Sequence, residues 1–194
     1  MKFSFKNDYS EGCHPKILEA LSQYNLDQQN GYGLDIYSEN TANIIREKSK
    51  SPESKVHLVS GGTQANLIVI SSILRPHESV VSANTGHIFT NETGAIEATG
   101  HKVHGVETKD GKLRPEDIQN VLDVHTNVPH QVKQKLVYIS NSTEVGTIYT
   151  KKELENLSEF CKKKNLYLFM DGARLGHALT AKSNDVTWED VAKL

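Results

Sequence analysis

The sequence predicts an α/β fold, a three-layer α/β/α domain with a mostly parallel sheet, preceded by an N-terminal helical arm. From residue 56 onward, short apolar segments alternate with helix-like segments, as they do in strand–helix–strand units. Residues 1–50 carry two amphipathic helical patterns, joined by a glycine-rich link through Gly31-Tyr32-Gly33. We therefore expect two regions, the arm at residues 1–50 and a large ligand-binding domain at residues 51–194.

The hydrophobic pattern places each element within these regions. Strands are expected at 56–59, 79–81, 101–106, 136–139 and 166–170, where apolar residues recur in short runs. Helices are expected at 15–24, 37–48, 64–74, 115–124, 151–164 and 188–194. Two helix starts carry signals of their own, because Pro115 suits the first helical position and Thr150 with Glu153 forms a capping box. Strands that alternate with helices pair in parallel and are covered on both faces.

The composition argues against several classes of partner. The 194 residues include 22 Lys and Arg and 24 Asp and Glu, so the formal charge is −2, and no basic block marks a nucleic-acid surface. The longest apolar run, Leu67 to Ile70, is far too short to cross a bilayer, and the first residues lack the apolar core of a signal peptide. We expect a soluble, cytoplasmic protein that binds neither nucleic acid nor a membrane.

A glycine-rich turn between an expected strand and an expected helix is a candidate phosphate site. Gly62 and Thr63 lie in this turn, and backbone N–H groups at a helix N-terminus attract anions. The spacing matches neither a dinucleotide fingerprint nor a Walker motif, so the functional interpretation is a mononucleotide-like phosphate or that of pyridoxal phosphate (PLP). The structural alternative is a tight turn in which Thr63 caps the helix.

A second candidate site lies where the apolar strand at 166–170 ends in Asp171. Ligands of open parallel sheets gather at the carboxyl ends of the strands. An Asp there would keep a pyridine nitrogen protonated, and Arg174 could meet a carboxylate in a two-pronged pair. The structural alternatives are a helix cap or loop acid for Asp171 and a solvated surface charge for Arg174.

His87 follows another expected strand and could stack over a flat cofactor. Its structural alternative is a polar surface or capping residue. His101 and His104 lack further ligands at convincing spacing, so no metal site is expected.

Three motifs follow one another along the chain: Gly62-Thr63-Gln64-Ala65-Asn66, His87 with Glu92, and Asp171-Gly172-Ala173-Arg174. Together they resemble the threonine aldolase branch of the threonine aldolase/β-eliminating lyase family, which belongs to the PLP enzymes of fold type I (aspartate-aminotransferase-like). Lys6-Asn7-Asp8 and Tyr32-Gly33-Leu34-Asp35 resemble two further elements of that family. The resemblance therefore covers nearly the whole chain.

The resemblance implies PLP as cofactor and a role for each matching residue. Gly62 and Thr63 would contact the phosphate, and His87 would stack on the ring. Asp171 would pair with the pyridine nitrogen, and Arg174 would bind the substrate carboxylate.

Two positions depart from the family pattern. Asn7 stands on the substrate side where many threonine aldolases carry Ser, and its amide can still donate a hydrogen bond to the substrate carboxylate. Glu144 stands where typical threonine aldolases carry a His near the substrate hydroxyl. We therefore expect Glu144 among the catalytic residues, and the reaction is left open.

The family's PLP-binding lysine is expected beyond this chain. It would lie on the strand after the Asp171 strand, whereas the sequence reaches Leu194 in an expected helix. Neither Lys182 nor Lys193 stands at the matching place. We therefore expect the lysine and the small C-terminal domain to be absent, and the 194-residue chain to be inactive by itself.

Three functional hypotheses follow. The resemblance implies a full-length enzyme that cleaves β-hydroxy-α-amino acids such as threonine to glycine and an aldehyde. A β-eliminating amino-acid lyase of the same family is the alternative that Glu144 raises. A hypothesis of another class is a non-catalytic fragment that binds PLP or another phosphate ligand. The family also implies a homodimer or homotetramer, to which the Tyr32 segment would contribute from the neighbouring subunit.

Overall fold

The computed structural model describes residues 8, 9 and 11–194, and its contacts divide the chain into two compact units. The first unit is Met1–Thr41 and the second is Ala42–Leu194. The expected domains, 1–50 and 51–194, stay a prediction. Asn7, the expected substrate contact, lies outside the described residues.

The expected helical arm is confirmed. Helix α1 spans Pro15–Tyr24, and helix α2 spans Ile36–Ser49 and so crosses the boundary between the units. Asp35 caps α2, because its two carboxylate oxygens accept from the Ser38 N–H at 2.8 Å and the Ser38 hydroxyl at 2.6 Å. The Tyr37 hydroxyl donates to Asp27 at 2.6 Å across the connection between the helices.

The second unit is built on a sheet of four strands that all run parallel. Strands β1 (Glu78–Ala83), β2 (Lys102–Val106), β3 (Lys133–Ser140) and β4 (Tyr167–Asp171) lie in the order β2-β1-β3-β4. The parallel pairs are β1 with β2, β1 with β3, and β3 with β4. Four of the five expected strands are therefore confirmed, and so is the parallel sheet.

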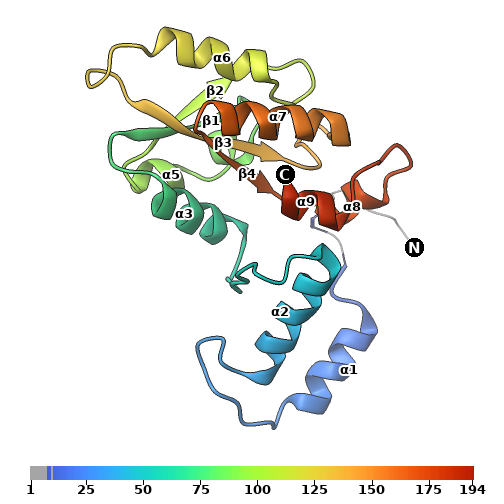
Figure 1. The fold of residues 1–194 in the computed structure, drawn as a ribbon. Coiled ribbons are helices and arrows are strands. Elements are labelled where there is room, and N and C mark those ends of the chain that lie inside the picture. Colours follow the sequence, from blue (N-terminus) through green and yellow to red (C-terminus); the bar gives the residue numbers. More distant parts are fainter. Residues whose placement is uncertain (1–7, 10) are drawn as a thin grey trace. The chain divides into compact units, whose positions relative to one another are not determined.

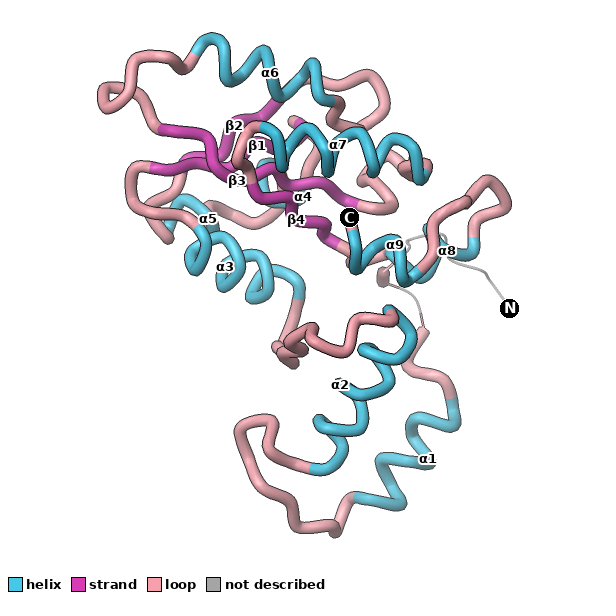
Figure 2. The backbone as a smooth tube through the Cα atoms, viewed as in Figure 1, coloured by secondary structure: helices cyan, strands magenta, loops and turns pink. Residues whose placement is uncertain are grey.

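Helices cover both faces of this sheet (Figures 1 and 2). The helices that lie wholly in the second unit are α3 (Gly62–Ile73), α4 (His87–Thr90), α5 (Ala95–Ala98), α6 (Pro115–Val124), α7 (Lys151–Lys163), α8 (Leu175–Thr180) and α9 (Trp188–Lys193). Figure 1 shows α6 and α7 over one face of the sheet and α3 and α5 over the other. The three-layer α/β/α arrangement is confirmed.

Alternation along the strands divides the core between the two faces. Successive side chains of a strand point to opposite sides of a sheet. Val80, Leu136 and Tyr138 accordingly belong to the cluster that also contains Ile70 of α3. Their neighbours along the strands, Val81, Val137 and Ile139, pack with side chains of α6 and α7, including Ile118, Leu154 and Leu157. β1 is buried along its whole length and β3 along most of it, as expected for central strands of a parallel sheet that is covered on both faces.

The prediction of a strand at residues 56–59 is wrong. This segment has no regular structure, and Leu58 and Val59 are 59% and 42% exposed. A strand needs a neighbour for its backbone N–H and C=O groups, and no strand in the described part of the chain pairs with this segment. Its apolar pattern is therefore not sufficient to form a strand here.

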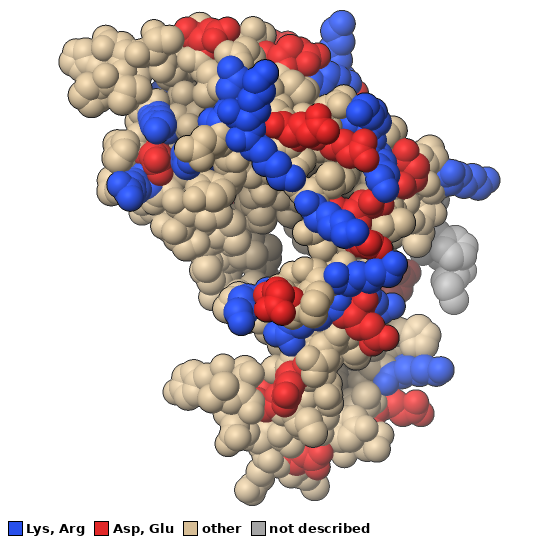
Figure 3. All heavy atoms as spheres, viewed as in Figure 1, with Lys and Arg blue, Asp and Glu red and all other residues tan. Residues whose placement is uncertain are grey.

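Charged side chains are mixed on the surface that carries α7 and α9. On the face shown in Figure 3, Lys and Arg alternate with Asp and Glu. Several of these charges pair, as Lys151 does with Asp190 at 2.7 Å and Lys50 does with Glu189 at 2.7 Å. Among the described residues, no helix is both long and apolar enough to cross a membrane.

Candidate active site

The strand order creates a switch point between β1 and β3. The chain leaves β1 toward β2 on one side and later places β3 on the other side, so the loops after β1 and β3 diverge. Ligands of open parallel sheets bind at such a point, outside the carboxyl ends of the strands. His87 follows β1, Glu144 follows β3 and Asp171 ends β4. The structure therefore brings these three expected residues to one edge of the sheet.

Asp171 is the acceptor at the centre of this edge. Its Oδ2 accepts from the Tyr138 hydroxyl at 2.7 Å and from the Asn66 amide at 3.2 Å. Its Oδ1 accepts from the backbone N–H of Ala173 at 2.9 Å. Burial, together with the nearby Asp171 carboxylate, raises the pKa of Tyr138, so the Tyr138 hydroxyl keeps its proton and donates it to Asp171. These donors hold Asp171 as an oriented carboxylate, and it does not cap α8, whose N-cap is Arg174.

Asn66 connects Asp171 with His87. The Asn66 amide also donates to Oε1 of Glu92 at 2.7 Å, and the same Glu92 oxygen lies 2.9 Å from Nδ1 of His87. Glu92 is buried, whereas the His87 side chain is 39% exposed. A buried carboxylate at Nδ1 orients the imidazole and leaves Nε2 for other contacts. His87 is thus a supported ring at the edge of the site, as stacking on a cofactor would require.

Glu144 is engaged with the backbone of His87. Its Oε1 accepts from the His87 N–H at 2.9 Å and from the Ser140 hydroxyl at 2.6 Å. Because Gly86 offers no side chain to cap α4, Glu144 supplies the acceptor for the first N–H of that helix. A turn between Thr143 and Thr147 holds the loop that carries Glu144, with their hydroxyl oxygens 2.7 Å apart.

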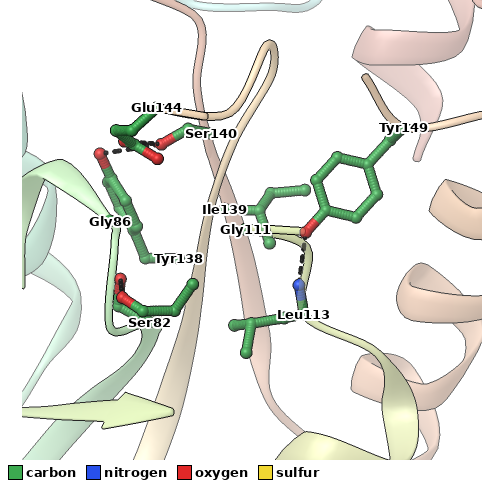
Figure 4. A pocket seen from close by; sticks show the side chains of 10 residues that line it. Ser82, Gly86, Gly111, Leu113, Tyr138, Ile139, Ser140, Glu144 and Tyr149 are labelled. Atoms are coloured by element: carbon green, nitrogen blue, oxygen red, sulfur yellow. Dashed lines mark hydrogen bonds between the residues drawn. The ribbon is translucent and has the colours of Figure 1, made fainter. Parts of the chain in front are cut away.

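The side chains under this edge are tightly packed. Figure 4 shows Glu144, Ser140 and Tyr138 on one side of β3 and Tyr149 with Leu113 on the other, and the space among them admits no water molecule. The Tyr149 hydroxyl accepts from the Leu113 N–H at 2.7 Å. A Cβ on Gly86 would lie 2.1 Å from Oγ of Ser82 and 3.0 Å from the carbonyl oxygen of Ala83, so any side chain here would have to displace Ser82 where β1 turns into α4. The candidate site therefore lies above a closely packed layer of side chains.

The glycine-rich turn forms the N-terminus of α3, as expected. Gly61 is the N-cap and the helix begins at Gly62, so Thr63 lies within the first turn and is not the cap. Gly62 and Thr63 are exposed, and a Cβ on Gly61 or Gly62 would meet nothing within 4 Å. The first N–H groups of a helix have no partners inside the helix. Asn66 of the same helix reaches Asp171, so this N-terminus lies beside the carboxyl end of β4.

Arg174 is partly buried and is the N-cap of α8, three residues after Asp171. Lys193 on α9 pairs with Glu189, and Lys182 is exposed in the connection between α8 and α9. Within the described ranges, 8, 9 and 11–194, no three His, Cys, Asp or Glu side chains gather as a metal site.

This donor set fits PLP. Asp171 retains acceptor capacity after three hydrogen bonds, because two carboxylate oxygens offer about four lone-pair sites. It would pair with the pyridine nitrogen. The first turn of α3, with Gly62 and Thr63, would hold the phosphate. The ring of His87 is available to stack.

Three residues of the network were not predicted: Asn66, Tyr138 and Ser140. Asn66 stands in the Gly62-Thr63-Gln64-Ala65-Asn66 motif, one helical turn after Gly62, and that spacing could have indicated its place beside the ligand. Tyr138 and Ser140 alternate at the end of an apolar strand. Polar residues on one face at the end of a strand are weaker evidence for a ligand site, because the residues that they contact lie far away in the sequence.

A family model described as Beta-eliminating lyase matches residues 12–193. The chain belongs to the β-eliminating lyase family. Two relatives named low specificity L-threonine aldolase, from Pseudomonas aeruginosa and a Pseudomonas species, are 30% and 32% identical to it over 190 residues. Each of these alignments covers 95% of this chain and 54% of the relative.

Solved structures of the family share the fold. A threonine aldolase from Leishmania major has a TM-score of 0.97 and 53% identity, and the match covers 100% of this chain and 56% of that one. A putative L-allo-threonine aldolase from Listeria monocytogenes has a TM-score of 0.64 and 18% identity, covering 94% and 50%. The resemblance to the family and the expected fold are therefore confirmed. The chain spans about half the length of the relatives it matches.

Proposed function

We propose that the complete gene product containing this chain is a PLP-dependent carbon–carbon lyase, which cleaves β-hydroxy-α-amino acids such as threonine to glycine and an aldehyde. The observation that carries the proposal is the meeting of Asp171, the N-terminus of α3 and His87 at one sheet edge. The relatives named low specificity L-threonine aldolase support the choice of reaction. Bound PLP would supply an electron sink for the pair released at the substrate α-carbon.

The residues of this chain divide the remaining tasks. Asp171, held by Tyr138 and Asn66, keeps a proton on the pyridine nitrogen. The first turn of α3, including Gly62 and Thr63, binds the phosphate. Arg174 binds the substrate carboxylate, and Asn7 is proposed as a second donor to it.

His87 and Glu144 complete the site on the substrate side. His87 covers the ring and, with Nδ1 against Glu92, presents Nε2 as a group that accepts or returns a proton. Glu144 keeps this histidine in place through its backbone N–H. We retain Glu144 as a candidate catalytic residue through its second carboxylate oxygen.

A β-eliminating lyase is the alternative, favoured by the description of the matching family model and by Glu144 in place of a histidine. The products separate the two reactions. Threonine gives glycine and acetaldehyde by aldol cleavage, and 2-oxobutanoate and ammonia by β-elimination. A chain that binds PLP and releases neither pair of products would favour the non-catalytic hypothesis.

We also propose that the protein is a cytoplasmic homodimer or homotetramer. Apolar side chains of α1 support self-association, because Ile17, Leu18 and Leu21 are 50%, 59% and 63% exposed and share one side of the helix. Tyr32 is fully exposed in the same unit, with a positive φ of 64°. In the oligomer, a second subunit would cover the apolar side of α1 and the Tyr32 side chain.

Substitution of Asp171 tests the function. In Asp171→Asn, an amide no longer offers the charge that holds the pyridinium proton, so we expect glycine formation by the complete gene product to fall about 10- to 100-fold. The matched control is Asp123→Asn, the same change on an exposed position of α6. Unchanged turnover in Asp171→Asn would contradict the proposal, as would the absence of any aldehyde from the unmodified enzyme with added PLP.

A further inference from the structure

Asn66 is a buried amide between two carboxylates from distant parts of the chain. It is 2% exposed and lies one turn into α3. Its Nδ2 donates to Oε1 of Glu92 at 2.7 Å and to Oδ2 of Asp171 at 3.2 Å. The two partners are 26 and 105 residues away in sequence. A single side chain thus connects the loop after β1 with the end of β4.

The chemistry of the amide fixes the hydrogen-bonding role of the two oxygens that face it. The Nδ2 atom carries two hydrogens and accepts nothing, so both facing oxygens must be acceptors. A proton on either facing oxygen would point at an N–H group and lose its hydrogen bond. The opposite orientation of the amide would place its oxygen against two carboxylate oxygens, which repel it. Asn66 therefore requires a hydrogen-bond acceptor at each of these two oxygens.

The Glu92 carboxylate depends on this donor. Glu92 is 4% exposed, and its Oε2 is buried without a hydrogen-bond partner. Only Oε1 is compensated, by Asn66 and His87. A buried carboxylate that loses a donor is strongly destabilised in its charged form. Without Asn66, the contact with His87 would be the one remaining hydrogen bond to the Glu92 carboxylate among the described residues.

We propose that Asn66 is a positioning residue, which joins the His87–Glu92 pair to Asp171 and keeps both carboxylates as acceptors. This inference rests on the proposed function, because His87 is assigned to the ring face of PLP and Asp171 to its pyridine nitrogen. Asn66 itself touches neither PLP nor substrate in this assignment. It acts through the two carboxylates.

The first test uses the PLP-free complete gene product with ¹⁵N-labelled histidine. In the unmodified protein, the Nδ1–H of His87 should give a resolved NMR signal, because Glu92 protects it from exchange with water. In Asn66→Leu, which keeps the approximate shape and removes both donors, we expect that signal to broaden or disappear. Asn120→Leu on the exposed face of α6 is the matched control and should keep it.

The second test is titration with PLP, followed by absorbance. We expect the PLP dissociation constant to rise about tenfold in Asn66→Leu and to stay unchanged in Asn120→Leu. Asn66→Asp, which also lacks both donors, replaces the leucine variant if that variant does not fold. Folded variants with an unchanged His87 signal and unchanged PLP affinity would overturn the proposal. If that result is found while the unmodified enzyme cleaves threonine, the role of Asn66 is refuted and the proposed function stands. If the unmodified enzyme shows no lyase activity, the proposed function is refuted, and the two tests still decide whether Asn66 positions His87.

Discussion

At the scale of single residues, the hydrogen bonds of one buried histidine in the sheet depend on whether its ring is protonated. His104 on β2 is buried, and its Nε2 lies 3.1 Å from Oγ of Ser79 and 3.3 Å from Nε2 of Gln134. The Gln134 amide nitrogen can only donate, so the His104 ring accepts at Nε2 and is neutral. Burial, and secondarily the nearby His125 and Lys102, lowers the pKa of His104 to about 4.

This shift predicts a loss of stability in mild acid. The folded-state pKa of His104 is below the unfolded value, so the neutral ring contributes stability above pH ~6.5, and that contribution is lost as the pH falls toward 4. The free energy of unfolding should fall between pH 7.5 and pH 4.5 in both proteins. We expect this fall to be smaller in His104→Gln than in the unmodified protein, by about 1–2 kcal/mol after allowance for solvent screening. Guanidinium denaturation at both pH values measures the difference. The exposed His57→Gln is the control, and equal pH dependence in His104→Gln and the unmodified protein would refute the prediction.

At the scale of elements, local signals at helix ends were reliable. Helix α7 begins with the expected capping box, in which the Thr150 N–H donates to Oε2 of Glu153 at 2.8 Å and the Glu153 N–H donates to Oγ1 of Thr150 at 3.3 Å. Glu153 also binds Lys112 at 2.7 Å, which ties this helix start to the loop before α6. Glu153 therefore both completes the cap of α7 and joins the start of this helix to the loop before α6.

Removal of the cap should destabilise the second unit measurably. In Thr150→Ala, the first-turn N–H groups lose a side-chain acceptor, so we expect the free energy of unfolding to fall by about 1 kcal/mol. Urea denaturation measures this change. Ser72→Ala is the control, because that hydroxyl lies inside α3 and bonds to the carbonyl of Val69 in its own helix. Identical transitions for Thr150→Ala and the unmodified protein would show that the cap contributes nothing.

At the scale of the whole molecule, the chain presents two units of different character. The second has a core buried on both faces of the sheet, whereas every side chain of α1 in the first unit is exposed. An amphipathic helix without a buried face lacks the packing that normally stabilises it. Self-association is the proposed source of that packing.

A charge on α1 tests this association. In Leu21→Glu, the carboxylate would have to be buried at the subunit contact, so we expect the dimer dissociation constant to rise at least about tenfold. Sedimentation velocity over a concentration series measures it. Lys16→Glu introduces the same residue outside the apolar side of α1 and should leave the association unchanged. A dimer equally tight in Leu21→Glu would exclude this face as the contact.

Features that depend on near neighbours in the chain could be predicted from the amino-acid sequence alone. Helix α6 begins at Pro115 and ends at Val124 as expected, and the motifs around Gly62, His87 and Asp171 lie at one edge of the sheet, where the candidate site is proposed. These signals are local, because capping, helical periodicity and strand alternation act over a few residues.

The meeting of distant groups, in contrast, is a property of the tertiary structure. Folding places Asn66 between Glu92 and Asp171, and it directs one oxygen of Glu144 to the backbone of His87. It also leaves the apolar segment at 56–59 outside the sheet. In each case the outcome depends on a partner far away in the sequence: a carboxylate needs a donor and a strand needs a neighbour, and neither partner can be read from the segment itself.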